Sequence, residues 1–415
     1  MADTRNTGFA LRAYLAVSPL IARLAPILLH RRLENGREDP ARWREKLGEP
    51  SVARPEGRLI WLHAVGLGEV LALRGLIAAM SDLEPELSFL VTSSARSSAQ
   101  VFAANRPRRT IHQFLPLDAP AYLARFLDHW RPDLSIWAEQ DLWPGAVVAA
   151  SERKIPLALV NARMNEKSYR KRHFFKSLYR DLYVRFGLVA AQDEDTAGHL
   201  RALGAPGVEV TGSIKIAAPE LSVDAAELGQ MREATQGRWV WLAASTHAAD
   251  EAVALEVQAG LFAADPRWLL ILVPRDPQRL MGFDLPFSRR SVGEAPGPEP
   301  VYLADTYGEL GLWYRLAEAA LIGGSFGTVG GHNPWEAAAL GCAVLHGPGI
   351  ANFRADYTLL DEAGAAVEVS AASLRDLLET GDMETLAVRA RGLVHSGRAA
   401  LIPLAENLLD QAYAR

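Results

Sequence analysis

The chain has 415 residues, more than one hydrophobic core usually organises, and its length predicts two domains of roughly 200 residues each. A hydrophobic content of 49% and a charged content of 22% are those of an ordinary globular protein. The net charge of −5 argues against a general nucleic-acid binder, and the single cysteine, Cys342, excludes an internal disulfide and a cysteine metal cluster.

The first apolar stretch runs from Gly8 to Leu29 and is interrupted by prolines and by Arg12 and Arg23. It is long enough to span a bilayer, but two arginines near its middle are costly in hydrocarbon. We therefore expect a helix that lies on the membrane surface. Between Met1 and Lys46 the sequence has nine basic and five acidic side chains, and this excess of positive charge would attract anionic headgroups. The alternative is a helix that packs against its own domain and keeps a solvated basic face.

Short apolar runs then alternate with helical patterns in two series along the chain. The first series begins at residues 58, 87, 110, 134, 155 and 188, and the second at 208, 239, 268, 300, 319, 342 and 365. This alternation is typical of doubly wound α/β domains with parallel sheets. The expected division is a helical segment at 1–48, a first α/β domain at 49–205, a second at 206–395, and a final helix at 396–415 that could cross back to the first domain.

In the first half, a strand that ends near Val65 is followed by Gly66, Gly68 and Glu69 at the start of a helix. The carboxyl ends of strands are where open α/β sheets place their sites. The helix dipole would keep Glu69 ionised, so it could accept a proton from a sugar hydroxyl, and the two glycines would make room for a substrate. A carboxylate that only stabilises its own helix is the alternative.

Two further groups follow strands of the same half. Glu139 and Asp141 come after the run at 134–138, on the same sheet edge as Glu69, where they could position hydroxyl groups or cap the next helix. A basic cluster follows the next strand and suits a phosphorylated acceptor, with a solvated helix face as the alternative. Its members include Arg163, Lys167, Arg170, Lys171 and Arg172.

In the second half, residues 320–349 predict a strand, a glycine-rich loop and a helix that begins with Asn333 as cap, Pro334 at the first position and Glu336 at the third. Backbone amides in such a loop and the positive end of the helix dipole favour a phosphate. The glycines are Gly323, Gly324, Gly330 and Gly331. An ordinary strand-to-helix turn is the alternative.

Polar and cationic side chains in other loops of the second series are expected to face this turn and to help bind one phosphate. They are Ser213, Lys215, Ser245, Thr246, His247, Arg275 and Arg279. The chain has no HExxH, GxSxG or GxxxxGK[ST] motif and no clustered histidine and cysteine ligands. No metal site is therefore predicted.

With these residues in view, the sequence resembles the Kdo transferases of lipopolysaccharide assembly, which use 3-deoxy-D-manno-octulosonic acid (Kdo). The motifs that carry the resemblance are HAVGLGE, EQDLWP, LVNARMNEKS, VTGSIK, AASTH, LVPRDPQR and GGSFGTVGGHNPWEAAALG. The sequence departs from the family pattern at Gly66, where serine is usual, and at Ala248 and Ala249, where glutamate and glycine are common.

The resemblance implies an inverting glycosyltransferase with the α/β GT-B fold. In this fold two Rossmann-like domains face each other across a cleft. The resemblance also implies an N-terminal helix that associates with the membrane. It implies CMP-Kdo as a substrate, no cofactor and no metal, a lipid A precursor as acceptor, and a place on the cytoplasmic face of the bacterial inner membrane. Another GT-B enzyme with a UDP-sugar donor, or a membrane-bound protein that only binds a nucleotide sugar, remains the alternative.

The resemblance also assigns roles to residues. The base of the family's HAVSVGE-like motif falls on Glu69. The donor set is Ser213, Lys215, Ser245, Thr246, His247, Arg275, Gly323, Gly324, Ser325, Gly330, Gly331, His332, Asn333 and Glu336, and the acceptor set is Gly68, Glu139, Asp141, Arg163, Arg170, Lys171 and Arg172.

Overall fold

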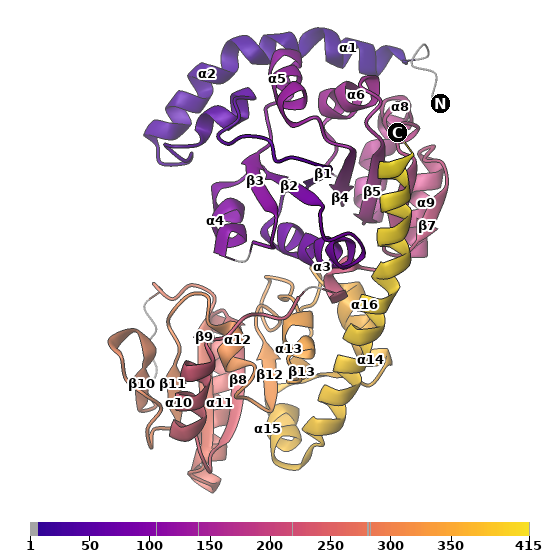
Figure 1. The fold of residues 1–415 in the computed structure, drawn as a ribbon. Coiled ribbons are helices and arrows are strands. Elements are labelled where there is room, and N and C mark those ends of the chain that lie inside the picture. The colour runs from indigo at the N-terminus through magenta and orange to yellow at the C-terminus, as the bar shows by residue number, and fades with distance from the viewer. Residues whose placement is uncertain are drawn as a thin grey trace. The chain divides into compact units, whose positions relative to one another are not determined.

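The computed structural model describes residues 7–104, 106–139, 141–217, 219–279, 282 and 284–414 (Figure 1). The chain divides into two compact units. The first consists of Met1–Ala218 together with Arg398–Arg415, and the second of Pro219–Gly397.

The first unit is built on a seven-stranded parallel sheet with the order β3-β2-β1-β4-β5-β6-β7. Its strands are β1 (Leu59–His63), β2 (Ser88–Ser93), β3 (Thr110–Phe114), β4 (Leu134–Ala138), β5 (Leu157–Ala162), β6 (Leu188–Ala191) and β7 (Val208–Val210). The prediction that the Val208 run opens the second series was wrong, because β7 pairs in parallel with β6 and completes the first sheet. The glycines and prolines before β7 form a turn within the first unit rather than a linker.

Helices cover both faces of this sheet, and the alternation of strand side chains explains why. Leu59 and Trp61 of β1 point into one hydrophobic cluster, whereas Ile60 and Leu62 point into the other. The helices are α3 (Leu67–Leu83), α4 (Arg96–Ala104), α5 (Pro120–Trp130), α6 (Pro144–Glu152), α7 (Glu166–Phe174), α8 (Lys176–Tyr183) and α9 (Glu194–Ala202), with the short η3 (Ile214–Ala217) packed into the cluster that contains α3.

The amino-terminal segment forms two helices, α1 (Phe9–Val17) and α2 (Pro19–Glu34), followed by the short η2 (Trp43–Leu47). Leu11 is buried in the core of the first unit, and Ala25 and Leu29 pack with Tyr122 of α5. Among the described helices, none by itself is long and apolar enough to cross a membrane. Together α1 and α2 meet that requirement by length and composition, with a bend of 45° between them.

The second unit repeats the architecture, with a parallel sheet of order β10-β11-β9-β8-β12-β13-β14. Its strands are β8 (Trp239–Thr246), β9 (Trp268–Pro274), β10 (Phe287–Arg289), β11 (Val301–Leu303), β12 (Ala319–Ile322), β13 (Ala343–His346) and β14 (Ala366–Glu368). Its helices are α10 (Ala225–Ala234), α11 (Ala248–Ala264), α12 (Leu310–Trp313), α13 (Trp335–Ala339), α14 (Arg354–Glu362) and α15 (Ala371–Thr380), with the short η4 (Arg290–Val292). The predicted pair of doubly wound parallel sheets is confirmed.

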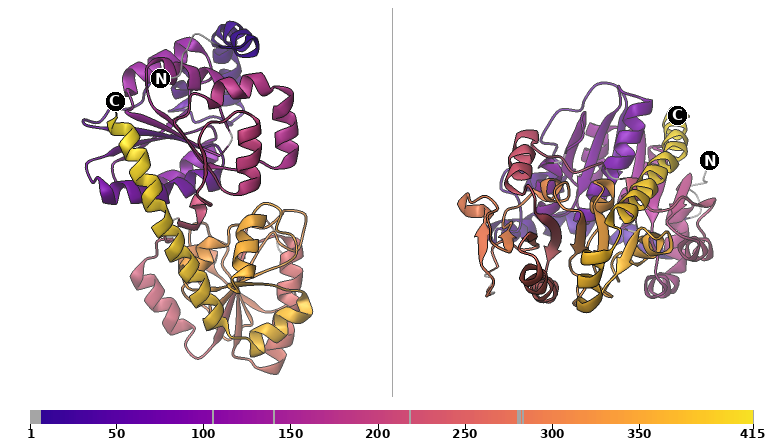
Figure 2. Two further views of the ribbon diagram at one scale, coloured as in Figure 1. Left: turned by 90° about the vertical axis from the view of Figure 1, so that its right-hand side faces the viewer. Right: turned by 90° about the horizontal axis from the view of Figure 1, so that it is seen from below.

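The last helix, α16 (Met383–Tyr413), is one continuous helix of 31 residues (Figure 2). Its first half belongs to the second unit, and from Arg398 onwards it belongs to the first. There, Leu401, Leu404 and Leu408 are buried in the same cluster as α3.

Candidate active site

Glu69 lies at the point in the first sheet where the strand order reverses. β1 lies between β2 and β4. From β1 the chain adds β2 and β3 on one side, and it then returns to add β4 and the later strands on the other side. Open α/β sheets bind ligands at the carboxyl ends of the strands at such a point. Glu69 follows β1, and Glu139 and Asp141 follow β4, so the structure brings these three carboxylates to one place.

The Glu69 side chain caps its own helix and remains partly exposed. Its Oε2 accepts hydrogen bonds from the amides of Val65, at 3.2 Å, and Gly66, at 3.1 Å. A Cβ atom added at Gly66 would lie 3.1 Å from Glu69 Oε1, so a serine at this position would place its side chain against the carboxylate. Capping and a chemical role are thus compatible here.

The helix dipole is not the dominant influence on the pKa of Glu69, which is raised. Burial raises the pKa of Glu69, and the neighbouring charge of Glu139 raises it further, whereas the two backbone hydrogen bonds only partly oppose this. A raised pKa makes a carboxylate a stronger base once it has lost its proton. Glu69 therefore suits proton abstraction better than an ordinary exposed carboxylate.

Lys215 lies in the first unit and pairs with Glu139. Its Nζ is 2.9 Å from Glu139 Oε1, with the two side chains 12% and 18% exposed. We had placed Lys215 and Ser213 in the second domain; they lie instead with the first unit, because η3 buries Ile214 and Ala217 in its core. Ser213 stabilises this turn, since its Oγ accepts the Lys215 amide at 3.3 Å.

Asp141 joins the acidic group to the basic cluster. Its Oδ2 accepts a hydrogen bond from Trp143 Nε1 at 2.8 Å and lies 3.9 Å from His63 Nε2. Burial would raise the pKa of Asp141, but the nearby His63, the hydrogen bond from Trp143 and the charge of Arg172 outweigh it, so the pKa is lowered. Asp141 therefore stays ionised beside Arg172.

The predicted acceptor cations lie on or near α7, a helix with no buried residues. Arg170 donates to Glu166 Oε1 at 2.6 Å, which neutralises part of its charge, and Lys171 is exposed. Arg172 is half-buried, with its guanidinium 5.4 Å from the centre of the Tyr179 ring. Arg163, just after β5, is partly buried, and Gly68 is exposed at the start of α3.

The second unit has its own reversal point between β8 and β12. Ser245, with a φ of 57°, Thr246 and His247 follow or end β8, and the glycine-rich loop follows β12. The two segments touch, since a Cβ added at Gly323 would lie 2.4 Å from the Ser245 carbonyl oxygen. Glycine is therefore required where this loop passes Ser245.

The amides of the glycine-rich loop are not an open phosphate nest, contrary to our expectation. Asp250 of α11 is fully buried, and its carboxylate accepts from the amides of Gly324, at 2.7 Å, Ser325, at 3.1 Å, Phe326, at 3.0 Å, and His247, at 2.9 Å. These amides are therefore not free to donate to a phosphate.

The amides of the other three predicted glycines and of His332 also have partners inside the protein. Gly323 donates to the Ala244 carbonyl, Gly330 and Gly331 donate to the Gly324 carbonyl, and the His332 amide donates to the Gly323 carbonyl. The sequence analysis missed Asp250, although its position three residues after His247 is the spacing of a capping box. These glycines shape the loop and do not contribute free donors.

The helix after the loop is shorter than predicted. α13 contains only Trp335–Ala339 and begins one residue later than expected, with Pro334 at the cap position. Asn333 still contributes, because its Oδ1 accepts the Trp335 amide at 3.2 Å and its Nδ2 lies 3.5 Å from Glu336 Oε1. A helix of this length has a small dipole, which weakens the predicted phosphate site further.

The imidazole rings of His247 and His332 are in contact, and both side chains are partly exposed. His247 Nε2 and His332 Nε2 are 3.0 Å apart, and the rings stack at an interplanar angle of 18°. One nitrogen must donate and the other accept, so at least one ring is neutral. Burial, followed by the charges of His247 and Arg275, lowers the pKa of His332 to about 4. Together with the exposed side chain of Arg275, the two histidines can bind an anion.

Thr246, by contrast, is buried and has a structural partner. Its Oγ1 donates to Glu251 Oε1 at 2.9 Å, and Arg279 pairs with the same carboxylate oxygen. Within the ranges that the structure describes, no group of three or more histidine, cysteine, aspartate or glutamate side chains could hold a metal ion.

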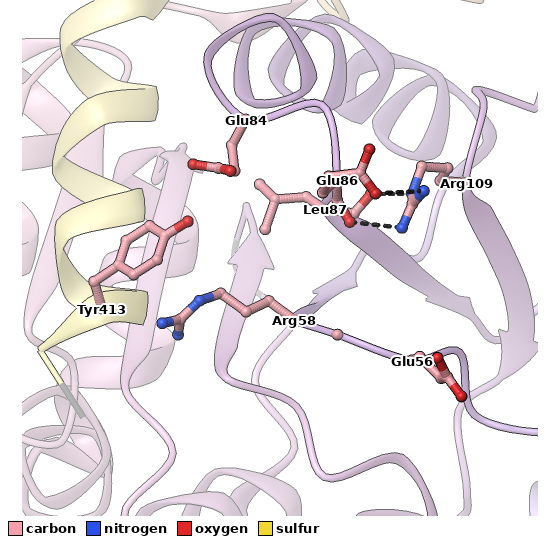
Figure 3. A pocket seen from close by; sticks show the side chains of 8 residues that line it. Glu56, Arg58, Glu84, Glu86, Leu87, Arg109 and Tyr413 are labelled. Carbon is pink, nitrogen blue, oxygen red and sulfur yellow. Dashed lines mark hydrogen bonds and ion pairs between the residues drawn. The ribbon is translucent and has the colours of Figure 1, made fainter.

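A surface pocket of about 350 Å³ lies elsewhere in the first unit (Figure 3). Arg58, Leu87 and Arg109 line it and immediately precede β1, β2 and β3, so it lies at the amino ends of the strands. Arg58 reaches across to α16, with its guanidinium 3.9 Å from the centre of the Tyr413 ring. This pocket is at the sheet edge opposite Glu69, and its contacts attach the end of α16.

Comparison with known proteins agrees with the two-unit architecture. A crystal structure of UDP-GlcNAc 2-epimerase from Neisseria meningitidis, bound to UDP-GlcNAc, is 18% identical, covers 85% of this chain and 100% of that chain, and gives a TM-score of 0.55. At this identity the likeness shows the fold alone. Two Rossmann-like units in succession are the GT-B architecture that the sequence predicted.

Sequence similarity is more specific. The family model of 3-deoxy-D-manno-octulosonic-acid transferase (kdotransferase) matches residues 41–218. A probable mitochondrial 3-deoxy-D-manno-octulosonic acid transferase of Arabidopsis thaliana is 32% identical over 90% of this chain and 88% of its own length. The 3-deoxy-D-manno-octulosonic acid transferase of Haemophilus influenzae is 32% identical over 87% of this chain and 86% of its own length. The chain therefore belongs to the family of 3-deoxy-D-manno-octulosonic acid (Kdo) transferases, which are glycosyltransferases.

Proposed function

We propose that this protein transfers Kdo from CMP-Kdo to a lipid A precursor with inversion at the anomeric carbon. The observation that carries the proposal is the Glu69 carboxylate, which is partly exposed at the reversal point of the first sheet and is held by the amides of Val65 and Gly66. Family membership supports the sugar that is transferred, and the residues support the roles below.

In the proposed reaction Glu69 takes the proton of an acceptor hydroxyl. The hydroxyl oxygen forms a bond to the anomeric carbon of Kdo while the bond from that carbon to the phosphate oxygen breaks, and CMP leaves with the bonding electrons. Attack from the face opposite to the leaving group inverts the configuration. The chemistry assigned to Glu69 requires an ionised carboxylate, so turnover falls as pH drops through its raised pKa.

The anionic donor would be held in the second unit. His247 follows β8, Arg275 follows β9 and His332 follows β12, and together they offer hydrogen-bond donors and positive charge. Cations that meet phosphate or carboxylate oxygens form strong, charge-assisted hydrogen bonds. Asp250 supports this region because its carboxylate accepts hydrogen bonds from amides of the glycine-rich loop.

The phosphorylated acceptor would meet the basic cluster of the first unit. Arg172 connects the cluster to Asp141, so an acceptor bound there lies near the acidic group that contains Glu69. Arginine and lysine side chains on an exposed helix suit lipid-borne phosphate groups. The cations proposed for this role are Arg163, Lys167, Arg170, Lys171 and Arg172.

A membrane surface would hold the acceptor's acyl chains, at the cytoplasmic face of a bacterial inner membrane. The supporting feature is an apolar face on α2, where Leu20, Leu24, Ile27 and Leu28 are exposed at helical spacing. Phe174, the last residue of α7, and Phe175, which follows it, are 83% and 50% exposed and come after the basic cluster. Apolar side chains beside cations suit an anionic bilayer surface.

Charge substitution on this face tests the membrane proposal. We expect Leu24→Glu and Leu28→Glu together to weaken binding to vesicles that contain anionic lipid by about tenfold or more, because each leucine contributes buried apolar area. Flotation or sedimentation of vesicles measures the effect. Val388→Glu on α16 is the matched control, since Val388 is 60% exposed but lies in the second unit. Equal vesicle binding by the wild type and the double variant would contradict the proposal.

The activity itself is tested by mass measurement of the product. The protein is incubated with CMP-Kdo, generated in situ, and a tetraacylated lipid A precursor. We expect the mass of one or more Kdo units to be added to the lipid. Transfer from a UDP-sugar instead, or binding of nucleotide sugars without any product, would replace this proposal with one of the alternatives.

A further inference from the structure

Glu139 occupies a turn that needs support from its surroundings. Its backbone φ is 60°, and Asn161 near the end of β5 has a φ of 54°. Residues other than glycine adopt this left-handed conformation at a cost in free energy, and they keep it only where neighbouring groups hold them. Such strain at the carboxyl ends of two adjacent strands directs attention to what the side chains hold.

Two groups hold the Glu139 carboxylate. Lys215 Nζ lies 2.9 Å from Oε1, and Asn161 Nδ2 lies 3.5 Å from the same oxygen. Glu69 follows β1, the strand that pairs with β4, and its carboxyl is near enough for the charge of Glu139 to raise its pKa. Asn161 also accepts the Ile214 amide at 3.1 Å, which ties η3 and therefore Lys215 to the end of β5.

We infer that Glu139 and Lys215 are positioning residues for Glu69, with Glu139 placing a negative charge at the end of the neighbouring strand and Lys215 balancing the charge of the two carboxylates. Two facing carboxyl groups in a partly buried site cannot both ionise easily, and a cation beside them makes the doubly ionised state accessible. The inference deepens the proposed function and rests on it only in that Glu69 takes the acceptor's proton.

The electrostatic consequence has a definite sign. The charge of Glu139 and burial raise the pKa of Glu69, whereas the positive charge of Lys215 favours ionised carboxylates. Other ionisable groups near this sheet edge have partners of their own. His63 at the end of β1 and Arg172 of α7 face Asp141, and Arg96 of α4 donates to the Gly36 carbonyl. The two residues should therefore act on Glu69 in opposite directions.

The test is the pH profile of kcat/KM for Kdo transfer in two variants. Glu139→Gln removes the repelling charge, so the acid limb should move towards lower pH by about half a unit or more. Lys215→Met removes the balancing cation, so the acid limb should move towards higher pH by a similar amount. Shifts in the same direction, or no shift in either variant, would overturn the inference, because general structural damage predicts no opposed pair.

Conservative variants keep the test decisive if Glu139→Gln fails to fold. Lys215→Arg retains the cation, so its acid limb should return close to that of the wild type, while Lys215→Met alone should remain shifted to higher pH. An acid limb that does not respond to Lys215→Met would refute the inference. Glu86→Gln is the control, since Glu86 pairs with Arg109 at the opposite edge of the sheet and should leave the profile unchanged.

A titration without substrate separates this inference from the proposed function. In protein with ¹³C-labelled glutamate carboxyl groups, the Glu69 resonance is identified by its loss in Glu69→Gln. Its midpoint should fall in Glu139→Gln and rise in Lys215→Met, whatever the wild type does with CMP-Kdo. Absence of Kdo transfer by the wild type would refute the proposed function, whereas unchanged midpoints would refute the role of Glu139 and Lys215.

Discussion

We expect the replacement of Glu69 by Gln to lower turnover by about 10²-fold or more, while CMP binding stays close to that of the wild type. Glutamine removes the charge that accepts the proton, but its side-chain oxygen can still accept the amides of Val65 and Gly66, so α3 keeps its cap. Single-turnover measurement of Kdo transfer gives the effect on the chemical step. Calorimetric titration with CMP shows whether the nucleotide still binds.

Glu69→Ala is the companion variant that separates capping from chemistry. It loses both the base and the cap, and loss of a helix cap costs about 1 kcal/mol of stability. We therefore expect equal loss of turnover in the two variants but lower stability in Glu69→Ala only. Turnover within a few fold of the wild type in Glu69→Gln would contradict the assignment of Glu69 as the base.

We expect the replacement of Asp250 by Ala to accelerate amide hydrogen exchange in the glycine-rich loop and to weaken binding of the sugar donor. The fully buried carboxylate accepts four backbone amides, and buried donors without a partner each cost about 1–3 kcal/mol. We expect hydrogen exchange at the amides of Gly324, Ser325 and Phe326 to accelerate by about 10²-fold or more. Affinity for CMP should fall as well, because the loop lies against the segment that carries Ser245 and His247.

Asp250→Asn should have an intermediate effect for a geometric reason. Oδ2 accepts from His247 and Gly324, and Oδ1 accepts from Ser325 and Phe326, so an amide side chain can serve only one of these pairs. Asp265→Asn at the other end of α11 is the control, since Asp265 pairs with Arg267 near the surface and should leave exchange in the loop unchanged. Slow exchange in Asp250→Ala would show that the carboxylate does not hold the loop.

The two parallel sheets could be predicted because the strands are buried on both faces and therefore appear as short, nearly continuous apolar runs. The position of β7 could not, since two of its three residues are exposed and the segment resembles a linker preceded by glycine and proline. Its assignment to the first sheet depends on pairing with β6, a contact that the local sequence pattern does not specify.

The sequence by itself determined the family, the alternation that builds two Rossmann-like units, and the place of Glu69 after a strand, because these depend on local pattern and on motifs. Only the tertiary structure showed that Asp250 accepts amides of the glycine-rich loop and that Lys215 pairs with Glu139. It also showed that burial raises the pKa of Glu69. The physical reason is that a backbone amide or a charge acts on whatever lies nearest in space, and the partners here come from different strands and helices.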